Sequence, residues 1–438
     1  MNRLFLLLAA APFVVACNSR PNQTGQTDSL TTDSTTTGSV DLPAPDTNAA
    51  KTNFSKVIGW PTGKTPVAPA GFTVTAFATN MKSPRSIYIA PNGDILIALS
   101  NSERDAKDKI ANAVSGKAKS EVGGESENTV LLFRDTNNDG KFEVRSTFLS
   151  GLNQPYGMLI IGNSFYVANT DGVFQYPYKA GETKITGKGK KIVSLPAGGY
   201  NNHWTRNLIA NANNSKIYIS VGSGSNVADH GMENEVRRAD ILEVNPDGTG
   251  EKIYASGLRN PVGMDWQPDS KMLWTAVNER DGLGDNLVPD YITSVKPGAF
   301  YGWPYSYYGQ HEDPRMKGQK PELVKSAVVP DVPVGSHTAS LGLAFYTGSK
   351  FPESYQKGAF IGQHGSWNRS ELAGYKVAFV PFKDGKPSGK LQDFLTGFIA
   401  DEKKSEVYGR PVDVAVANDG SLLVADDVSS TIWRVAAN

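Results

Sequence analysis

Short runs in which apolar and polar residues alternate recur along the chain, and each is soon followed by a second such run. The turns between paired runs are of the Pro-Asn-Gly or Asn-Asp-Gly type, as at residues 91–93. Alternation with a period of two residues predicts half-buried β-strands, and a glycine-containing turn between two such runs predicts a β-hairpin. The hairpin recurs at residues 84–97, 155–167, 207–219, 261–274, 341–361 and 411–424.

Further apolar segments follow the hairpins and can supply outer strands to each repeat, so that the spacing fits four strands per repeat. Repeats of this kind close into a ring of sheets, which leaves only short strand edges exposed. We therefore predict an all-β fold, a six-bladed β-propeller with four-stranded antiparallel blades. The outer-strand segments include residues 130–133, 241–244, 375–378 and 431–434.

The longest connections between the predicted strands span residues 100–128 and 281–340. In a propeller, loops gather at one end of the central channel, where small ligands bind, so we expect function on these loops. The first connection is polar and rich in Lys and Glu, and we expect it to be a mobile surface loop rather than a catalytic one.

The N-terminus carries the features of an export signal. Arg3 precedes an apolar run at residues 4–16, which is too short to span a bilayer and ends at Cys17, the only cysteine. Residues 14–17, Val-Val-Ala-Cys, resemble the lipobox of bacterial lipoproteins, in which the cysteine is lipidated. An ordinary signal peptide with an incidental cysteine is the alternative. The lipobox predicts a lipid anchor on Cys17 in the bacterial cell envelope, and residues 18–19 are compatible with the periplasmic face of the outer membrane.

Residues 18–52 are rich in Ser, Thr, Asp and Pro and contain few aliphatic side chains. Such a segment cannot bury enough apolar surface to offset the entropy lost on ordering. We therefore predict three parts: a signal peptide and lipobox at 1–17, a disordered tether at 18–52, and the propeller at 53–438.

Positive and negative side chains are balanced, with 44 Lys and Arg against 44 Asp and Glu. No net field draws such a protein to nucleic acid or to an anionic membrane surface. We expect a small neutral molecule as the partner, and no nucleic acid.

Few histidines are available as catalytic bases, since the chain has 5. His203 lies in a polar loop just before the first strand of the third repeat, which places it at the mouth of the channel. That position is consistent with a catalytic base and equally with a structural hydrogen bond. His364 lies where a strand of the fifth repeat opens into a loop, and we expect it to line the pocket.

Arg259 and Arg410 precede the first strands of the fourth and sixth repeats, so both are expected to point into the channel mouth. A guanidinium binds carboxylates in a bidentate manner, so the pair could clamp a polyanionic ligand. Salt bridges between blades are the alternative.

Two segments carry the oxygen ligands that calcium prefers. Residues 278–286 form an acidic loop punctuated by glycines, and we consider it a candidate calcium site. Residues 135–140 begin like an EF-hand loop, but Ser146 stands at the twelfth position and no helical pattern flanks the segment. We interpret this second segment as a hairpin turn.

Several motifs resemble those of the glucose/sorbosone dehydrogenase family, which includes soluble glucose dehydrogenases, aldose sugar dehydrogenases and sorbosone dehydrogenases. The resemblance covers roughly residues 65–437. It implies an enzyme that oxidises sugars with the quinone cofactor PQQ and with calcium. The most specific motifs are Gly-Leu-Arg-Asn-Pro at 257–261, Asn-Glu-Arg-Asp-Gly at 278–282, Tyr-Gly-Trp-Pro at 301–304, His-Gly-Ser-Trp-Asn-Arg at 364–369 and Gly-Arg-Pro at 409–411.

The resemblance also implies roles for single residues. His203 matches the family's general base, which takes a hydroxyl proton from the sugar while a hydride passes to the quinone. Arg259 and Asn260 match residues that contact the substrate and the quinone, and Arg410 matches one that pairs with a PQQ carboxylate.

The same resemblance implies a metal site. The backbone carbonyls of Arg280 and Asp281 match the ligands of a calcium ion that would polarise the quinone. Calcium is therefore expected beside the cofactor.

Three positions depart from the glucose dehydrogenase pattern. Ser223 stands where that type has an aspartate that orients the base. A lysine that contacts PQQ is replaced near His364, and one arginine of a pair is replaced by Val412. These departures resemble those of the sorbosone branch, which favours a sugar other than glucose.

Three functions compete. The first is a PQQ- and calcium-dependent dehydrogenase of an aldose or a related sugar aldehyde, with an electron acceptor that the motifs do not specify. The second is a non-catalytic envelope propeller that binds a carbohydrate or another protein. The third is a calcium-dependent lactonase, which needs carboxylates around one metal, and here Asp413, Asp426 and Asp427 do not form a convincing set.

Overall fold

The computed structural model describes residues 40–48, 51–103, 106–121, 123–137 and 139–438. The predicted signal peptide with Cys17, and most of the predicted tether, lie outside these residues. Within the described ranges, no helix is long and apolar enough to cross a membrane.

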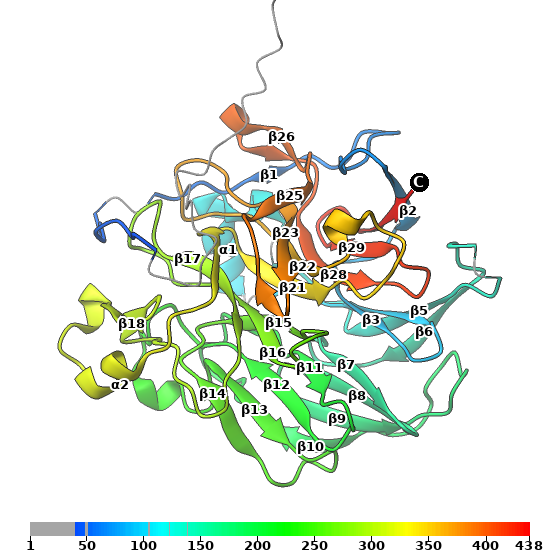
Figure 1. Ribbon diagram of the computed structural model, residues 1–438, viewed down its shortest axis with the longest axis horizontal. Coiled ribbons are helices and arrows are strands. Elements are labelled where there is room, and N and C mark those ends of the chain that lie inside the picture. Colours follow the sequence, from blue (N-terminus) through cyan, green and yellow to red (C-terminus); the bar gives the residue numbers. More distant parts are fainter. Residues whose placement is uncertain (1–39, 49–50, 104–105, 122, 138) are drawn as a thin grey trace, which may run out of the picture. The chain divides into compact units, whose positions relative to one another are not determined.

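Six antiparallel sheets surround a common axis, and each contains one of the predicted hairpins (Figure 1). The first three blades follow one another along the chain, and in each the first strand of the hairpin is the innermost. Blade 1 contains β3 (Pro84–Ile89), β4 (Ile95–Leu99), β5 (Thr129–Arg134) and β6 (Val144–Ser150). Blade 2 contains β7 (Met158–Ile161), β8 (Ser164–Asn169), β9 (Gly172–Pro177) and β10 (Lys190–Ser194). Blade 3 contains β11 (Leu208–Ala210), β12 (Ile217–Val221), β13 (Asp240–Val244) and β14 (Lys252–Ser256).

The remaining blades show the same arrangement with two variations. Blade 4 contains β15 (Pro261–Trp266), β16 (Leu273–Val277), β17 (Pro289–Ser294) and β20 (Val332–Ser336). Blade 5 contains β21 (Ser340–Phe345), β22 (Gly358–Gln363), β23 (Lys376–Lys383), β24 (Lys386–Pro387) and β25 (Gln392–Leu395). Blade 6 contains β28 (Pro411–Val416), β29 (Leu422–Asp426), β30 (Thr431–Ala437) and β2 (Phe72–Ala78). The predicted fold class is confirmed.

Blade 6 joins the two ends of the propeller. β2 pairs antiparallel with β30, so that Phe72 lies opposite Ala437 and Val74 lies opposite Val435. A ring closed by a shared sheet cannot open without breaking a ladder of backbone hydrogen bonds.

Neighbouring inner strands approach each other closely at glycines. A Cβ atom at Gly157 would overlap the backbone at Leu208 of the next blade, so a larger residue is excluded there. Buried carboxylates add links between blades. Asp413 accepts a hydrogen bond from the backbone N–H of Ile87 at 2.8 Å, and this contact joins blade 6 to blade 1.

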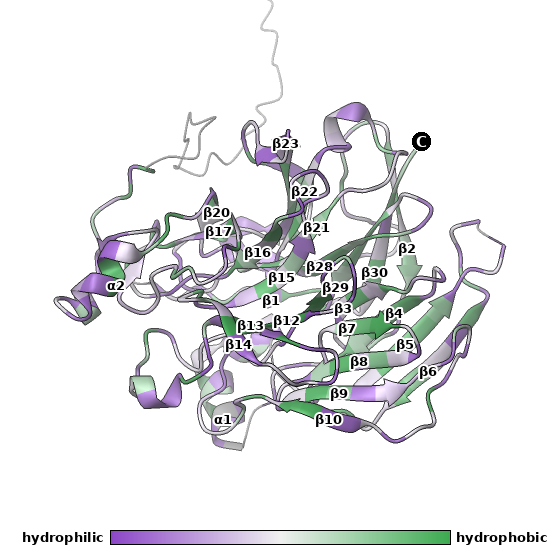
Figure 2. Cartoon of the chain, turned by 60° about the horizontal axis from the view of Figure 1, so that its bottom comes forward, coloured by the Kyte–Doolittle hydropathy of each residue, from purple (hydrophilic) through white to green (hydrophobic). Residues whose placement is uncertain are grey.

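Apolar side chains fill the spaces between the blades. All five residues of β4 are buried, as are those of β12 and β16, because the inner strands are covered on both faces by neighbouring blades. Figure 2 shows β4, β7 and β8 as predominantly hydrophobic and the connecting loops as predominantly hydrophilic.

The two long connections contain more structure than the sequence predicted. Residues 100–128 contain α1 (Ala106–Ser115) and the 3₁₀ helix η1 (Lys117–Ser120), in place of the expected irregular loop. Residues 281–340 contain β17 and β20, and a long insertion between these paired strands hides the hairpin pattern. The insertion carries β18 (Ser306–Tyr307), β19 (His311–Glu312), η3 (Pro314–Met316) and α2 (Pro321–Ser326), and other loops carry η2 (Met232–Asn234), η4 (Glu353–Tyr355) and η5 (Glu402–Lys404).

The segment before the first blade packs against the propeller. β1 (Lys56–Val57) pairs parallel with β27 (Glu406–Val407), which pairs with β26 (Ile399–Asp401). Val40 is only 7% exposed, and the backbone N–H of Asp46 donates to the carbonyl of Leu283 at 3.0 Å. Val40 and β1 therefore contact the propeller, whereas residues 41, 43–48 and 51–52 are exposed, and the tether at 18–52 stays a prediction.

Candidate functional site

A cavity of about 410 Å³ opens at the end of the propeller where the inner strands begin. It is lined by the starts of β3 and β21, by the loops that precede β11, β15 and β21, and by the loops that follow β4, β12, β16 and β22. The lining includes most of the residues singled out in the sequence, namely His203, Arg259, Asn260, Asp281 and His364. The structure thus brings together residues that are far apart in the chain.

His203 has a defined tautomer in this cavity. Its Nδ1 lies 2.8 Å from the carbonyl oxygen of Ser223 and 3.0 Å from the Ser223 hydroxyl. A carbonyl oxygen can only accept a hydrogen bond, so Nδ1 carries the ring proton. The Ser223 hydroxyl in turn donates to the carbonyl of Ser225 at 2.7 Å. The remaining ring nitrogen, Nε2, is left with a lone pair that can accept a proton.

The surroundings of His203 keep it neutral. Burial, and then the positive charge of Arg259, lower the pKa of His203 to about 3. The hydrogen bond from Nδ1 to Ser223 and the negative charge of Asp281 act in the opposite direction but are weaker. A neutral imidazole at physiological pH is the form that a general base requires.

A buried carboxylate fixes the loop that orients His203. Glu235 is 5% exposed and accepts hydrogen bonds from the backbone N–H groups of Gly224 and Ser225, at 2.7 and 3.1 Å, and from the Ser225 hydroxyl at 2.6 Å. These bonds hold the loop that presents the Ser223 carbonyl to His203. Glu235 therefore acts on the base through the backbone of its neighbours.

Arg259 is held rigidly beside the base. Its guanidinium donates to the carbonyls of Asn226, Asn278 and Glu279, the last at 2.7 Å, and forms an ion pair with Asp281 at 3.4 Å. The side chain is almost completely buried. A fixed positive charge is thereby maintained at the wall of the cavity, as predicted.

Two polar atoms at the cavity have no hydrogen-bond partner among the described residues. They are Oδ1 of Asn260 and Nε of Arg85, and both residues are more than nine-tenths buried. An unpaired buried polar atom is costly unless a ligand or water satisfies it. These atoms indicate where a polar ligand would bind.

His364 forms a buried network with Asp427 and Arg85. Its Nε2 lies 2.9 Å from Oδ1 of Asp427, and the other carboxylate oxygen of Asp427 pairs with Arg85. Because the carboxylate accepts, Nε2 of His364 carries the proton and Nδ1 has the lone pair. Burial, and then the charge of Arg410, lower the pKa of His364 to about 4, so this ring is also neutral.

Arg410 forms hydrogen bonds to the backbone of the loop that carries His364. Its Nε donates to the carbonyl of His364 at 2.9 Å and its Nη2 donates to the carbonyl of Gly365 at 3.0 Å. The guanidinium also lies over the ring of Tyr375. Arg410 does not belong to the cavity lining and supports the loop that carries His364, so the predicted clamp of two arginines stays a prediction.

The two predicted calcium ligands, the backbone carbonyls of Arg280 and Asp281, have different surroundings, and calcium binding by them stays a prediction. The carbonyl oxygen of Asp281 already accepts hydrogen bonds from Arg315 Nη1 at 2.8 Å and from Asn226 Nδ2 at 3.0 Å. The Arg280 side chain is fully buried between Glu279 and Asp313, and these ion pairs hold the backbone that carries its carbonyl. Sequence reasoning could not detect this, since Arg315 comes from the insertion between β17 and β20.

The carboxylates considered for a lactonase site do not converge on one point. Asp413 accepts from the backbone of Ile87, Asp426 accepts from the backbone of Arg410 and from Trp60, and Asp427 binds His364 and Arg85. Among the described residues, a group able to hold a metal ion is found elsewhere, at Asp135, Asp139 and Glu143.

That acidic group lies at the far end of blade 1. Residues 135–140 join β5 to β6, as expected for a hairpin turn. A larger cavity of about 810 Å³ adjoins this turn and is lined by two ion pairs, Arg134 with Asp94 and Arg434 with Asp419. It contains none of the predicted site residues, so we place the functional site at the His203 cavity.

Trp367 and Lys117 are among the residues of the His203 cavity that were not assigned a role from the sequence. Trp367 is 42% exposed, lines the cavity and stacks on Phe54 with 5.7 Å between ring centroids. Lys117 of η1 lines the cavity as well, although its segment was expected to be a surface loop. Trp367 lies within the His-Gly-Ser-Trp-Asn-Arg motif and could have been identified from it, whereas nothing in the sequence around Lys117 marks it.

Comparison with known proteins identifies the family of this chain. The model of the TrAA12-like family matches residues 66–300 and 312–438. An uncharacterized protein of Borreliella burgdorferi is 31% identical over 300 residues, which cover 66% of this chain and 77% of that protein. The aldose sugar dehydrogenase YliI of Escherichia coli is 33% identical over 130 residues, which cover 28% of this chain and 33% of that enzyme.

Solved structures show the same fold at low identity. The calcium structure of a Trichoderma reesei enzyme of family AA12 has a TM-score of 0.69 and 18% identity, covering 88% of this chain and 99% of that one. The holo PQQ domain of the Coprinopsis cinerea pyranose dehydrogenase has a TM-score of 0.67 and 18% identity, covering 87% and 100%. The apo aldose sugar dehydrogenase of Escherichia coli has a TM-score of 0.56 and 19% identity, covering 84% and 100%.

These likenesses confirm the propeller fold and the family resemblance inferred from the motifs, while the sorbosone branch stays a prediction. The family match covers both the loops that carry His203 and Arg259 and the loops that carry His364 and Arg410. The chain belongs to the TrAA12-like family.

Proposed function

We propose that this protein is a PQQ-dependent oxidoreductase that oxidises an aldose or a related sugar aldehyde, with His203 as the general base. The observation that carries the proposal is the state of His203, which is neutral, lines the cavity and has its only ring proton fixed on Nδ1. Sugar dehydrogenases among the relatives and structural neighbours support the reaction class.

The cavity residues fit a planar, polyanionic quinone. Arg259 and Lys117 bring positive charge to the lining, and Arg85 has an unpartnered Nε there. The unpartnered Oδ1 of Asn260 can accept a hydrogen bond from a ligand N–H or O–H group. When bound, PQQ supplies the acceptor for the hydride that leaves the sugar.

The chain's own groups handle the proton. Nε2 of His203 can accept the proton of a sugar hydroxyl, and this step requires the hydroxyl within hydrogen-bond reach of the ring. The positive charge of Arg259 beside the ring opposes its protonation. The protonated ring therefore releases its proton readily and returns to the neutral form. The Ser223 carbonyl accepts the same hydrogen bond from Nδ1 in the neutral and in the protonated ring. This bond is its only contribution to the stability of the protonated ring.

Trp367 is suited to bind the sugar itself. Its ring is exposed at the cavity and is supported from behind by Phe54, with only 8° between the ring planes. An aromatic face offers a large apolar area with few degrees of freedom to lose on binding. Trp367 therefore provides a surface against which a sugar ring can pack.

Reconstitution of the purified full-length chain with PQQ tests the proposal. We expect saturable binding followed by reduction of an artificial dye that depends on the sugar, measured over a panel of aldoses and sugar aldehydes. Failure to bind PQQ, or binding without sugar-dependent reduction, would contradict the proposal. The first of these outcomes would favour the non-catalytic binding propeller.

We also propose that the protein is a lipoprotein of the bacterial envelope, on the strength of the Val-Val-Ala-Cys sequence that ends at Cys17. Mass spectrometry of the protein purified from membranes should show a lipid-modified Cys17 at the mature N-terminus. A Cys17→Ser variant should then leave the detergent phase in a Triton X-114 partition. Partition of the wild-type protein into the aqueous phase would contradict the anchor.

A further inference from the structure

We propose that the N-terminal segment, residues 51–58, is part of the sugar-binding site, with Phe54 as the residue that positions Trp367. This segment precedes the part of the chain that the family model matches, which begins at residue 66. The inference deepens the proposed function and rests on it, because it takes Trp367 as the surface on which the sugar packs. Its structural part concerns contacts within this chain alone.

Phe54 supports the ring of Trp367. The two rings are stacked, with 5.7 Å between their centroids and 8° between their planes. Trp367 is 42% exposed and lines the His203 cavity, whereas Phe54 does not belong to the lining. A side chain that is held in place before binding loses less freedom when the ligand arrives. Phe54 therefore preserves the orientation in which Trp367 meets a sugar.

Hydrogen bonds join the N-terminal segment to the loop that carries Trp367. The backbone N–H of Asn53 donates to the carbonyl of Trp367 at 2.8 Å. Nδ2 of Asn53 donates to the carbonyl of Ser370 at 2.9 Å. In the opposite direction, Nδ2 of Asn368 donates to the carbonyl of Lys51 at 3.1 Å. Contacts in both directions over so short a stretch fix the register of the segment against the loop.

The N-terminal segment is itself fixed to the propeller. Its strand β1 pairs with β27, and the Ser405 hydroxyl donates to Oδ1 of Asn53 at 2.8 Å. Just after the segment, Nε1 of Trp60 donates to the buried carboxylate of Asp426 at 2.9 Å. Phe54 lies between these attachment points, so its ring is a fixed support rather than a free side chain.

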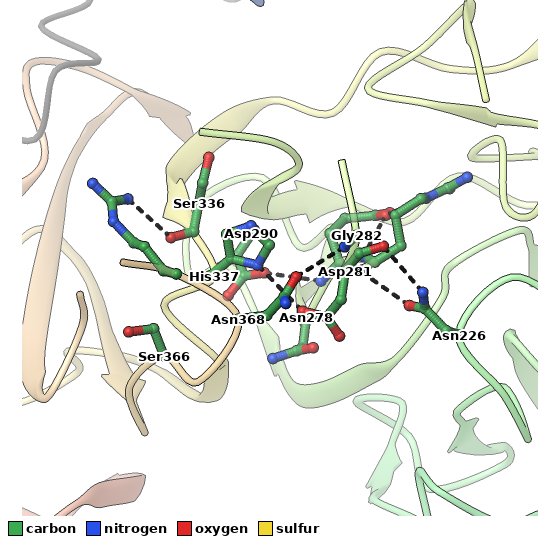
Figure 3. A network of polar contacts seen from close by, with 12 residues as sticks. Asn226, Asn278, Asp281, Gly282, Asp290, Ser336, His337, Ser366 and Asn368 are labelled. Atoms are coloured by element: carbon green, nitrogen blue, oxygen red, sulfur yellow. Dashed lines mark hydrogen bonds and ion pairs between the residues drawn. The ribbon is translucent and has the colours of Figure 1, made fainter. Parts of the chain in front are cut away.

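The loop that carries Trp367 is also tied to the wall of the cavity. Oδ1 of Asn368 accepts a hydrogen bond from the backbone N–H of Gly282 at 2.9 Å. Figure 3 shows Asn368 beside Gly282 and Asp281, and Asp281 lines the cavity. One amide side chain thus links the N-terminal segment to the loop that follows β16. Trp367 is therefore placed against the rest of the cavity through the N-terminal segment as well as through its own loop.

Loss of Phe54 should consequently act on sugar binding and leave the chemistry unchanged. Phe54 acts through Trp367 and is a positioning residue. The packing that it supports is equally available in the ground state and the transition state, so its removal should raise KM with little change in kcat.

The first test is ¹⁹F NMR of the full-length chain labelled with 5-fluorotryptophan, without PQQ. Trp367→Phe identifies the Trp367 resonance among those of the 7 tryptophans. We expect Phe54→Ala to increase the relaxation of that resonance by a soluble paramagnetic chelate, and Phe54→Leu to increase it less, while the other resonances keep their positions. An unchanged Trp367 resonance in both variants would overturn the inference.

Phe77→Ala is the matched control for these variants. Phe77 is also a half-buried phenylalanine that packs on another ring, that of Phe133, but it lines the cavity at the far end of blade 1. This control should leave the Trp367 resonance and the kinetic constants as in the wild type.

The second test is steady-state kinetics of the PQQ-loaded protein. We expect Phe54→Ala to raise KM for the sugar about fivefold with kcat within about twofold of the wild type, and Phe54→Tyr, which keeps the ring, to restore KM. In the Trp367→Ala background, Phe54→Ala should raise KM no further, since residues that act through one contact are not additive. An unchanged KM in Phe54→Ala, or additive effects of the two substitutions, would overturn the inference.

The third test separates this inference from the proposed function. The Trp367 resonance is followed while the sugar panel is added in the absence of PQQ, which measures sugar binding without turnover. We expect Phe54→Ala to weaken this binding about fivefold. A wild-type protein that binds sugar at Trp367 but does not oxidise it would contradict the proposed function and support the inference. Absence of any response of Trp367 to sugar would overturn the inference.

Discussion

The Nδ1 atom of His203 lies 2.8 Å from the backbone carbonyl oxygen of Ser223, so a main-chain atom orients the candidate base where an aspartate does so in the glucose dehydrogenase type. A carbonyl fixes the tautomer of the ring without adding a negative charge beside it. The pKa of the base is therefore set mainly by burial and by Arg259.

This arrangement predicts a small effect of Ser223→Ala on turnover. The substitution removes the hydroxyl, at 3.0 Å from Nδ1, and leaves the carbonyl in place. We expect kcat to fall less than about tenfold, since the orienting hydrogen bond is retained. Steady-state kinetics on the PQQ-loaded enzyme would check this, and a loss comparable to that of His203→Ala would show that the hydroxyl orients the base.

The pH dependence of the reaction follows from the lowered pKa of His203. Because the pKa is about 3 in the folded protein, the base stays neutral well below its ordinary value of 6.5. We expect kcat/KM to show no acid limb near pH 6.5 when it is measured from about pH 8 down to about pH 5. An acid limb centred near 6.5 would indicate that His203 is solvated and freely protonated.

The same lowered pKa makes folding stability depend on pH. The unfolded chain binds a proton at His203 below pH 6.5, whereas the folded protein does not until about pH 3. Stability from this group is therefore present above 6.5 and is lost as the pH falls from 6.5 towards 3. In urea unfolding curves at pH 7 and pH 5, the pH-dependent loss should be smaller in His203→Gln than in the wild type.

Removal of the aromatic surface at Trp367 should weaken sugar binding. We expect Trp367→Ala to raise KM roughly tenfold with little change in kcat, because the packing is equally available in the ground state and the transition state. The KM of Trp367→Phe should lie between the KM of the wild type and that of Trp367→Ala. Tyr200→Ala is a suitable control, since Tyr200 is 54% exposed and does not belong to the cavity lining. A fall in kcat at unchanged KM would contradict the assignment.

We expect substitution of Arg410 to lower the folding stability rather than the affinity for PQQ. Arg410→Ala leaves the buried carbonyls of His364 and Gly365 without donors, which should cost roughly 2–5 kcal/mol of unfolding free energy. Arg434→Ala, at the partly exposed pair with Asp419, should cost less than about 1 kcal/mol. Unchanged stability together with lost PQQ affinity would instead support direct contact between Arg410 and the cofactor.

The fold could be predicted because each blade repeats a local pattern. Alternation and turn residues mark the hairpins at 84–97 and 411–424, and these become β3–β4 and β28–β29. The strands β17 and β20 could not be predicted in this way, since an insertion separates two strands that pair with each other. The pairing of β2 with β30 also depends on contacts between distant parts of the chain.

For the candidate site, the sequence was sufficient to predict which loops meet. His203, Arg259 and Asn260 precede inner strands, and that position alone places them at one end of the channel. The direction of a side chain depends on local partners, so the sequence could not predict that Arg410 donates to the carbonyls of His364 and Gly365. The engagement of Asp281 by Arg315 depends on the insertion and has no local signal.

The central claim is that His203 is the base in sugar oxidation, and single-turnover reduction of bound PQQ tests it most directly. With saturating sugar, His203→Gln should slow the absorbance change of the quinone by roughly 10²–10⁴-fold while PQQ affinity stays within about twofold of the wild type. A rate in His203→Gln close to that of the wild type, with PQQ fully bound, would contradict the account.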